Sequence, residues 1–250
     1  MRKLIFLLSL LFLGTATVMA AESYTALWKQ YYAAAEEWHP RTGMTLLDKI
    51  ITRAAAEKEY GHLVKAQICR SSMMVQLAPD SFDIEVARME RAEAAATDSV
   101  LKAVYATVLG KLYRDSYQYA NKDGHEAKCR ACFARALQDK DRLAHTQAQV
   151  YEPLVVCGGY ASVFDDDLLH VIGFEARAYA ELRDYYAAHA NRRAACIMAG
   201  WAVSDYYNNV APGVHRAKQL QQIDSLIAVY QDIEGAGDLA IRRFVLMKID

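Results

Sequence analysis

Apolar residues recur at helical spacing along almost the whole chain, and this repetition restricts the fold more than any other feature. In SYTALWKQYYAAAEEW, Tyr24, Leu27 and Tyr31 fall on one stripe. Their i, i+3, i+7 spacing is typical of an amphipathic helix. The pattern returns in residues 42–58, 62–77, 79–96, 98–120, 126–137, 165–176, 177–190, 191–207 and 214–233.

No segment shows sustained alternation of apolar and polar residues, and the 250 residues include only four Pro and twelve Gly. The sequence therefore predicts an all-α chain of about ten to twelve helices. Links of about two to five residues require antiparallel neighbours. Small Ala residues between aromatic ones favour a tetratricopeptide-like solenoid of helical hairpins, although the consensus Trp-Leu-Gly-Tyr spacing is not met. A plain helical bundle is the alternative.

Several residues mark expected helix ends. Pro40 interrupts the first helical pattern, and Asp98 begins the longest one. Ser81 is a predicted N-cap, with Glu85 near the capping-box position. Residues 151–163 contain Pro153, Gly158 and Gly159, which predicts an irregular connection and a candidate boundary within a helical domain at 21–250.

The first twenty residues, MRKLIFLLSLLFLGTATVMA, have the character of a secretory signal peptide. Arg2 and Lys3 precede an apolar run from Leu4 to Leu13, and small residues lead to Ala20. The run is shorter than the roughly 20 residues that span a bilayer, which argues against an uncleaved anchor. We expect an exported, periplasmic protein that begins at Ala21 and has no membrane span after cleavage. The formal net charge of −1 gives no basic excess for binding nucleic acid.

Cys129 and Cys132 in EAKCRACFARAL allow three interpretations. A redox pair would lie at a helix N-terminus, but this helix is expected to start near Gly124 or His125, which places Cys129 in the second turn. A metal site could use His125, Cys129 and Cys132, with a fourth ligand such as His145. We favour a buried stripe in which both cysteines pack with Phe133 and Ala136. Five cysteines leave at least one unpaired within a monomer, and their pairing is open.

Other chemically active residues lack a recognisable catalytic arrangement. The run Asp165-Asp166-Asp167 could bind a cation, but it precedes a helical pattern, so helix capping is favoured. His170 and His189 have no carboxylate or nucleophile at a motif spacing. The tyrosine pairs 31–32, 185–186 and 206–207 are expected in helix packing. Without a GxSxG, HExxH or phosphate-loop motif, the chain is predicted to be neither an enzyme nor cofactor-dependent.

Several segments, taken in order, resemble a known family. They are YTALWKQ, LLDKIITRAAAEKEYGHLVKAQI, DSVLKAVYATVLGKLY, FDDDLLHVIGFEARAYAELRDYYAAHANRRAACIMA and IDSLIAVYQDIEGAGDLAIRR. Together they are similar to the N-terminal helical region of large bacterial alpha-2-macroglobulin-like proteins. The resemblance covers nearly all of residues 21–250 and rests on packing positions.

This resemblance implies a scaffold or docking region in a protease-inhibitor or envelope-defence protein, followed by β-sandwich domains. The sequence contains no β-sandwich segment and no thioester motif, so no inhibitory residue can be assigned, and a fragment is expected. A free-standing periplasmic adaptor for another protein is the alternative. The final segment, AGDLAIRRFVLMKID, is too apolar for a solvated cap, and we expect it to expose an apolar patch, to self-associate or to fray from about Gly235.

Overall fold

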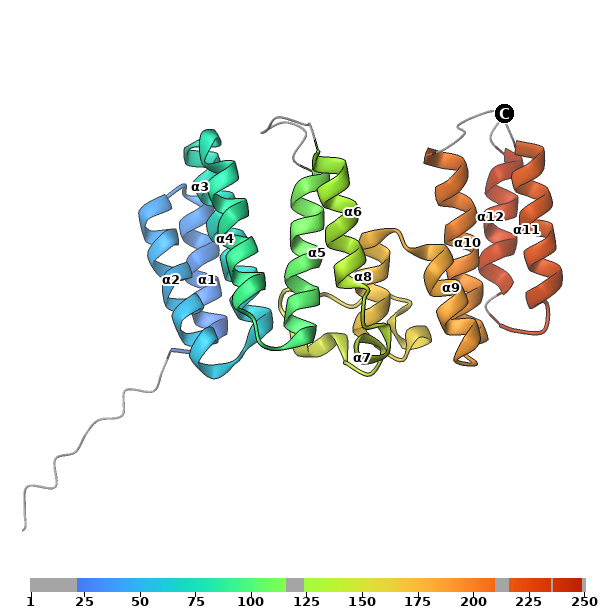
Figure 1. The fold of residues 1–250 in the computed structure, drawn as a ribbon, viewed down its shortest axis with the longest axis horizontal. Helices are drawn as coiled ribbons and strands as arrows, with labels where there is room; N and C mark the ends of the chain where they lie inside the picture. The colour runs from blue at the N-terminus through green and yellow to red at the C-terminus, as the bar shows by residue number, and fades with distance from the viewer. Residues whose placement is uncertain (1–21, 116–123, 210–215, 235, 249–250) are drawn as a thin grey trace, which may run out of the picture. The chain divides into compact units, whose positions relative to one another are not determined.

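The computed structural model describes residues 22–115, 124–209, 216–234 and 236–248. Within these residues the chain forms twelve α-helices, three short 3-10 helices and no β-strand (Figure 1). The predicted all-α class is therefore confirmed. The predicted signal peptide lies outside the described residues.

The helical elements follow one another along the chain in the order given next. They are α1 (Tyr24–Glu36), α2 (Pro40–Glu57), α3 (Tyr60–Leu77), η1 (Pro79–Ser81), α4 (Phe82–Ala95), α5 (Ser99–Asp115), α6 (His125–Ala136), α7 (Lys140–Ala144), η2 (Ala148–Tyr151), η3 (Ala161–Phe164), α8 (Leu168–Ala176), α9 (Tyr179–Ala188), α10 (Arg192–Asn209), α11 (Arg216–Tyr230) and α12 (Ala236–Lys248).

The chain divides into two compact units, and the boundary between Leu46 and Leu47 falls inside α2. The candidate boundary at 151–163 lies within the second unit. That segment is irregular, as predicted, because it consists of the end of η2, turns and η3.

The first unit contains α1, whose N-terminus is capped by Ser23. The Ser23 hydroxyl accepts a hydrogen bond from the Ala26 N–H at 3.2 Å. Trp28 stacks on Tyr32 with a centroid distance of 5.8 Å and meets Tyr31 edge-on. The predicted stripe is confirmed for Leu27 and Tyr31, which are buried.

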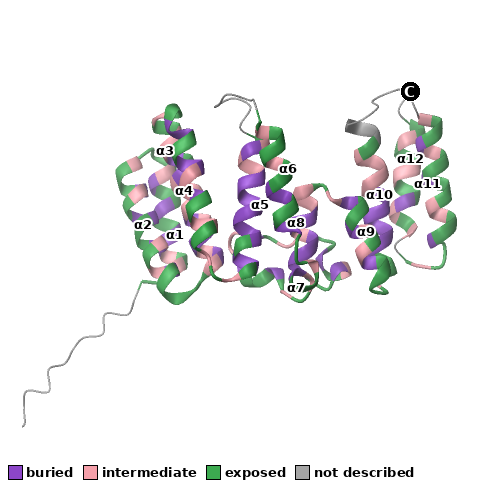
Figure 2. Cartoon of the chain, viewed as in Figure 1, coloured by how far each residue is buried: buried purple, intermediate pink, exposed green. Residues whose placement is uncertain are grey.

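Helix α5 is the most deeply buried element of the second unit. It packs against α4, α6 and α8, and buried residues cover most of its length (Figure 2). The α6 contact is close because position 110 is a glycine. A Cβ there would lie 2.9 Å from the Phe133 ring, which is less than the normal contact distance. Apolar residues on several faces of α5 thus join its neighbours into one core.

Two predicted helix starts carry side-chain caps. Asp98 accepts from the Leu101 N–H at 2.8 Å at the start of α5. Asp167 accepts from the His170 N–H at 2.7 Å at the start of α8. These bonds satisfy backbone donors that the first helical turn leaves without partners. The capping interpretation of the acidic run thus holds for Asp167. Pro40 is the first residue of α2, where the missing N–H costs no hydrogen bond because the first N–H groups of a helix have no acceptor within it.

The capping-box prediction at Ser81 was wrong. Ser81 precedes α4, but its hydroxyl makes no capping bond and has no partner in the structure. The residue lies in a helical conformation, φ −77° and ψ −4°, because η1 leads directly into α4. An N-cap needs extended backbone to aim its oxygen at the free N–H groups. Glu85 instead accepts a hydrogen bond from the Ser71 hydroxyl at 2.7 Å.

Candidate binding groove

A cavity of about 480 Å³ lies beside α5 in the second unit. Val104, Val108 and Leu112 form its α5 side, and α8 contributes Leu168, Val171 and Ile172. Ile68 of α3, Phe82 of α4 and the segment Leu154–Val156 complete the apolar part of the lining, and four polar or charged residues also line the cavity: Thr107, Lys111, Asp115 and Glu175. The walls are therefore mainly aliphatic or aromatic, as in pockets that bind apolar groups.

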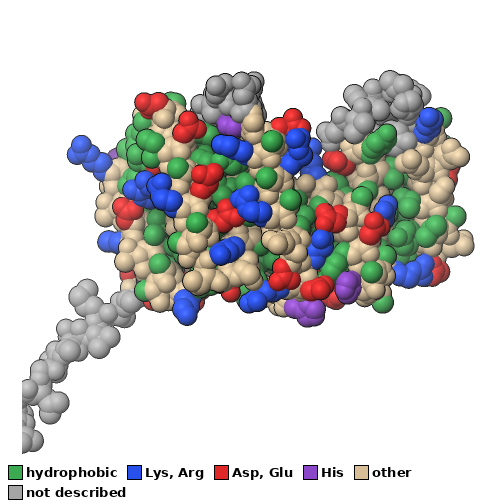
Figure 3. Space-filling view, viewed as in Figure 1, with side chains coloured by type: hydrophobic (Ala, Val, Ile, Leu, Met, Phe, Trp, Pro, Cys, Tyr) green, Lys and Arg blue, Asp and Glu red, His purple; other side chains and the backbone are tan. Residues whose placement is uncertain are grey.

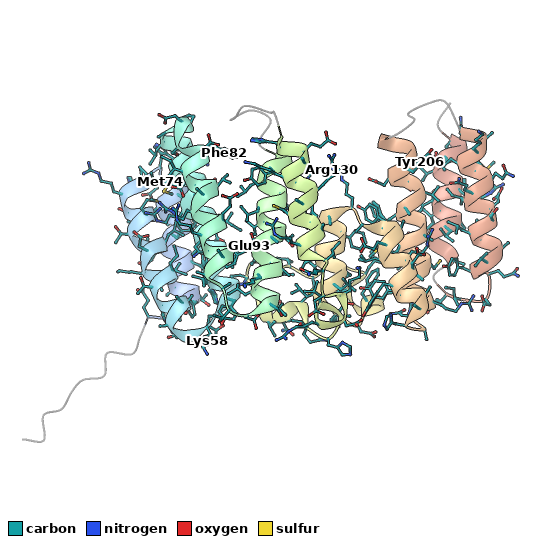
Figure 4. All side chains as sticks on the ribbon, viewed as in Figure 1. Lys58, Met74, Phe82, Glu93, Arg130 and Tyr206 are labelled. Carbon is teal, nitrogen blue, oxygen red and sulfur yellow. The ribbon has the colours of Figure 1, made fainter. Side chains whose placement is uncertain are left out.

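A second cavity of about 260 Å³ adjoins the first. Both are lined by Ile68, Phe82 and Leu112, so they form one surface, which we call the α5 groove. The remaining lining of the second cavity comes from α3 and α4: Ser71, Ser72, Val75, Gln76, Glu85, Val86 and Met89. Figure 3 shows hydrophobic side chains gathered over the space between α4 and α5, and Figure 4 labels Phe82 at the start of α4.

The wall formed by Leu154–Val156 is held in place from α3. Lys65 Nζ donates a hydrogen bond to the Pro153 carbonyl at 3.2 Å. Gly61, in the first turn of α3, lies against the backbone of Tyr151 and Glu152. Val156 is 86% exposed at the mouth of the groove. An irregular segment thus forms a fixed wall because two contacts with α3 anchor its start.

Charged groups lie at the rim of the groove. Lys111 Nζ is 2.5 Å from Glu175 Oε1, and Arg114 donates to the Glu175 carbonyl at 2.5 Å. Asp115 is exposed, and the Arg114 Nε lies 3.4 Å from its carboxylate. Glu85 is buried between Ser71 and Arg88. Three of the four charged side chains that line the two cavities are carboxylates. Glu175 and Glu85 are paired with basic side chains, so Asp115, whose side chain is 66% exposed, is the most accessible acidic group at the rim.

The predicted metal candidates do not form a metal-binding group. Among the described residues, no set of three or more His, Cys, Asp or Glu side chains is placed to hold an ion. The His125 ring lies near the rings of Tyr113 and Phe82, at centroid distances of 5.4 and 6.5 Å. The His145 Nδ1 lies 2.6 Å from the carbonyl oxygen of Asp141.

The two cysteines of α6 differ in environment. Cys132 is buried with Phe133 and Ala136, whereas Cys129 is half-buried at the edge of the core. Burial raises the pKa of both thiols above the ordinary value. Burial also raises the pKa of Cys196 to about 11. A raised pKa keeps a thiol protonated and unreactive, which supports the packing interpretation.

The structure brings His170 and Asp167 together, which the sequence motifs did not indicate. His170 Nδ1 lies 2.9 Å from Asp167 Oδ1, and the Tyr186 hydroxyl donates to Asp167 Oδ2 at 2.7 Å. The His170 ring stacks on Phe164 at 4.9 Å. All four residues are buried. A carboxylate three residues before a histidine is the signal that could have revealed the pair, since one helical turn separates the two. The arrangement satisfies buried polar groups and caps α8.

His189 also has a carboxylate neighbour, in contrast to the sequence-based expectation. Its Nε2 lies 3.7 Å from Asp141 Oδ1, and its ring stacks on Tyr185 at 4.1 Å. The Tyr185 hydroxyl donates to the same carboxylate oxygen at 2.8 Å. His189 and Asp141 are exposed and Tyr185 is half-buried, and their contacts connect α7 to α9. Within the tyrosine pairs, Tyr31 and Tyr186 pack in the interior as predicted, whereas Tyr32 and Tyr206 are about half exposed.

The α5 groove was not among the sequence-based candidates. Its residues belong to the same helical stripes that build the core, so each is indistinguishable from a core residue in the sequence. Phe82 and Val86 of α4 lie at helical spacing, as do Val104 and Val108 of α5. Only the separation between the helices shows that these side chains border a cavity.

No protein-family model matches the chain, and neither a curated protein nor a solved structure is significantly similar to it. None of the described helices is both long enough and apolar enough to cross a membrane.

Proposed function

We propose that the chain is a non-enzymatic docking module whose α5 groove receives an apolar segment of a partner protein. The observation that carries this proposal is the mainly apolar lining of the two adjoining cavities, about 480 and 260 Å³. Binding to a groove of this kind is favoured by about 25 cal/mol for each Å² of apolar surface that is removed from water.

The occupant is proposed to be a peptide segment with apolar anchors and at least one Lys or Arg. Anchors at i, i+3 and i+4 of an amphipathic helix would enter the groove, as in other helix-in-groove complexes. The basic residue would lie near Asp115, because its carboxylate is the most exposed acidic group at the rim of the groove. Charge complementarity of this type mainly determines which partners are accepted.

The sequence resemblance suggests where such a segment would come from. The chain resembles the helical region that precedes the β-sandwich domains of bacterial alpha-2-macroglobulin-like proteins. We therefore propose an exported helical-repeat scaffold whose groove engages one of those domains. A separate envelope protein as the partner would instead make the chain a free-standing periplasmic adaptor.

Site-specific photo-crosslinking in cells tests the docking proposal. The photoreactive residue p-benzoylphenylalanine replaces Leu112, which is half-buried in the groove, and in a control it replaces Ile84. Ile84 is 61% exposed on α4 and does not line either cavity. We expect a discrete adduct from position 112, and its mapped peptide should be apolar and contain Lys or Arg.

Charge reversal at the rim gives a second test, with the same crosslinked adduct as the measurement. Asp115→Lys should reduce the adduct from position 112 several-fold, because it repels the basic residue of the partner. Equal adducts from positions 112 and 84, no adduct at 112, or a mapped peptide without a basic residue would each overturn the proposal. A mapped β-sandwich sequence would favour the scaffold, and an unrelated envelope protein would favour the adaptor.

A further inference from the structure

Helix α12 carries an apolar face that its own unit leaves uncovered. Ile241 is 64% exposed, Phe244 56%, and Val245 and Met247 52% each. Leu239 on the opposite side is fully buried against α10 and α11. Figure 3 shows hydrophobic side chains gathered over α11 and α12. The apolar segment predicted at the end of the chain is thus exposed at these four positions, but Leu239 belongs to the core.

The spacing of these residues makes the face continuous. Ile241, Phe244 and Val245 are related by i, i+3 and i+4, so they lie on one side of the helix. Ala240 and Gly237 are also exposed on α12, and a Cβ added at Gly237 would meet no atom within 4 Å. A solvated outer helix normally carries polar residues on this side, and a face of this size marks an interaction surface.

The side chains on this face are large at its C-terminal end and small at its N-terminal end. Phe244 and Met247 lie in its C-terminal half, and Gly237 and Ala240 lie in its N-terminal half. When two such helices pack antiparallel, one register places Phe244 over Ala240 of the second copy and Met247 over Gly237. Large side chains then fill the space above small ones, and Ile241 lies near the two-fold axis.

The charges of the helix favour the same orientation. Glu234 precedes α12 with a side chain 83% exposed, 3.4 Å from Arg193. Asp238 lies in the first turn, where it is paired with Arg242 at 2.8 Å, so Glu234 is the accessible acidic group at this end. Lys248 is exposed in the last turn, where its Nζ lies 4.5 Å from the centroid of the Phe244 ring. Antiparallel pairing places Lys248 of each copy at the acidic end of the other and also opposes the two helix dipoles.

We propose that two copies of this chain associate through the apolar face of α12, packed antiparallel about a two-fold axis. The surface is self-complementary in shape and in charge, as an isologous interface must be.

Sedimentation equilibrium of the full chain over a wide concentration range tests the pairing. We expect a monomer–dimer equilibrium in which Phe244→Glu raises the dissociation constant at least about tenfold, because a charge would be buried at the centre of the interface. Ile84→Glu is the matched control, since Ile84 is equally exposed on α4 and should leave the dimer unchanged. Both positions are on the surface, so far-UV circular dichroism should be unaffected.

Disulfide trapping tests the orientation. A chain with Ala240→Cys mixed with a chain with Phe244→Cys should form the 240–244 heterodimer, identified by peptide mapping because native cysteines are present. Preferential 240–240 and 244–244 links would indicate parallel pairing and overturn the proposed register. A monomer at all concentrations, a dimer insensitive to Phe244→Glu, or open-ended oligomers would overturn the proposal itself.

Discussion

Gly61 lies directly against the backbone of Glu152, so that no side chain fits between them. A Cβ at position 61 would be 2.5 Å from the Tyr151 carbonyl carbon and closer still to the Glu152 carbonyl oxygen. The contact joins the first turn of α3 to the end of η2, and the groove wall at Leu154–Val156 begins just beyond it. Position 61 therefore requires glycine, because the backbone of residues 151–152 approaches α3 too closely for any side chain.

Gly61→Ala is expected to destabilise the protein by about 1–3 kcal/mol, because backbone atoms cannot turn away as a side chain could. The gain in helix propensity, about 1 kcal/mol, is too small to offset this. Chemical denaturation would measure the change in unfolding free energy. Gly158→Ala is the control, since a Cβ there meets no atom within 4 Å. Equal stabilities for the two variants would contradict the close contact.

Tyr186→Phe should lower stability and also change its dependence on pH. The Tyr186 hydroxyl donates to the buried Asp167 carboxylate, and its loss should cost about 1.5–3 kcal/mol. Burial and the Asp167 charge raise the pKa of Tyr186 well above its ordinary 10. As the pH rises, Tyr186 therefore loses its proton in the unfolded chain before it does so in the folded protein. Its contribution to the free energy of unfolding is fully present below about pH 10 and is lost as the pH rises further.

Urea denaturation of both proteins at pH 8 and in steps above pH 10 measures this effect. The difference between wild type and Tyr186→Phe should shrink as the pH rises. Tyr185→Phe is the control: its hydroxyl bonds the exposed Asp141, so its removal should cost less than about 1 kcal/mol. A constant difference between wild type and Tyr186→Phe would indicate that the tyrosine does not titrate with unfolding.

The helices could be predicted because their signals are local. The spacing of Leu27 and Tyr31 and the cap at Asp98 depend only on nearby residues, and both are found in the structure. Ser81 shows where such reasoning fails. Its sequence context is that of a cap, but the preceding turn sets its backbone, and the tertiary contact with Ser71 draws Glu85 inward.

The groove depends on distances between helices, which no local pattern encodes. Ile68 and Ile172 both fit an interior stripe, although both border the cavity. The exposed face of α12 was more accessible to prediction, because Phe244 and Met247 belong to an unusually apolar segment. Leu239 was not distinguished from them, since its burial depends on packing against α10 and α11.

Export remains a prediction, and the identity of the first residue of the exported protein tests it. The signal peptide should be removed after Ala20, since small residues precede that position. N-terminal sequencing of protein from the periplasmic fraction should therefore begin at Ala21. Recovery of an intact Met1 from that fraction would show instead that the segment is retained as an anchor.

The two cysteines of α6 should respond differently to truncation if they are packing residues. Cys132→Ala is expected to cost about 1–2 kcal/mol, because it leaves a space in the core and removes the 3.5 Å contact with Arg135. Cys129→Ala should cost less, since Cys129 is only half-buried. Denaturation under reducing conditions would measure both. Elemental analysis of protein purified without chelator gives the decisive comparison: stoichiometric zinc in the wild type, lost in the double variant, would mean that the cysteines bind metal.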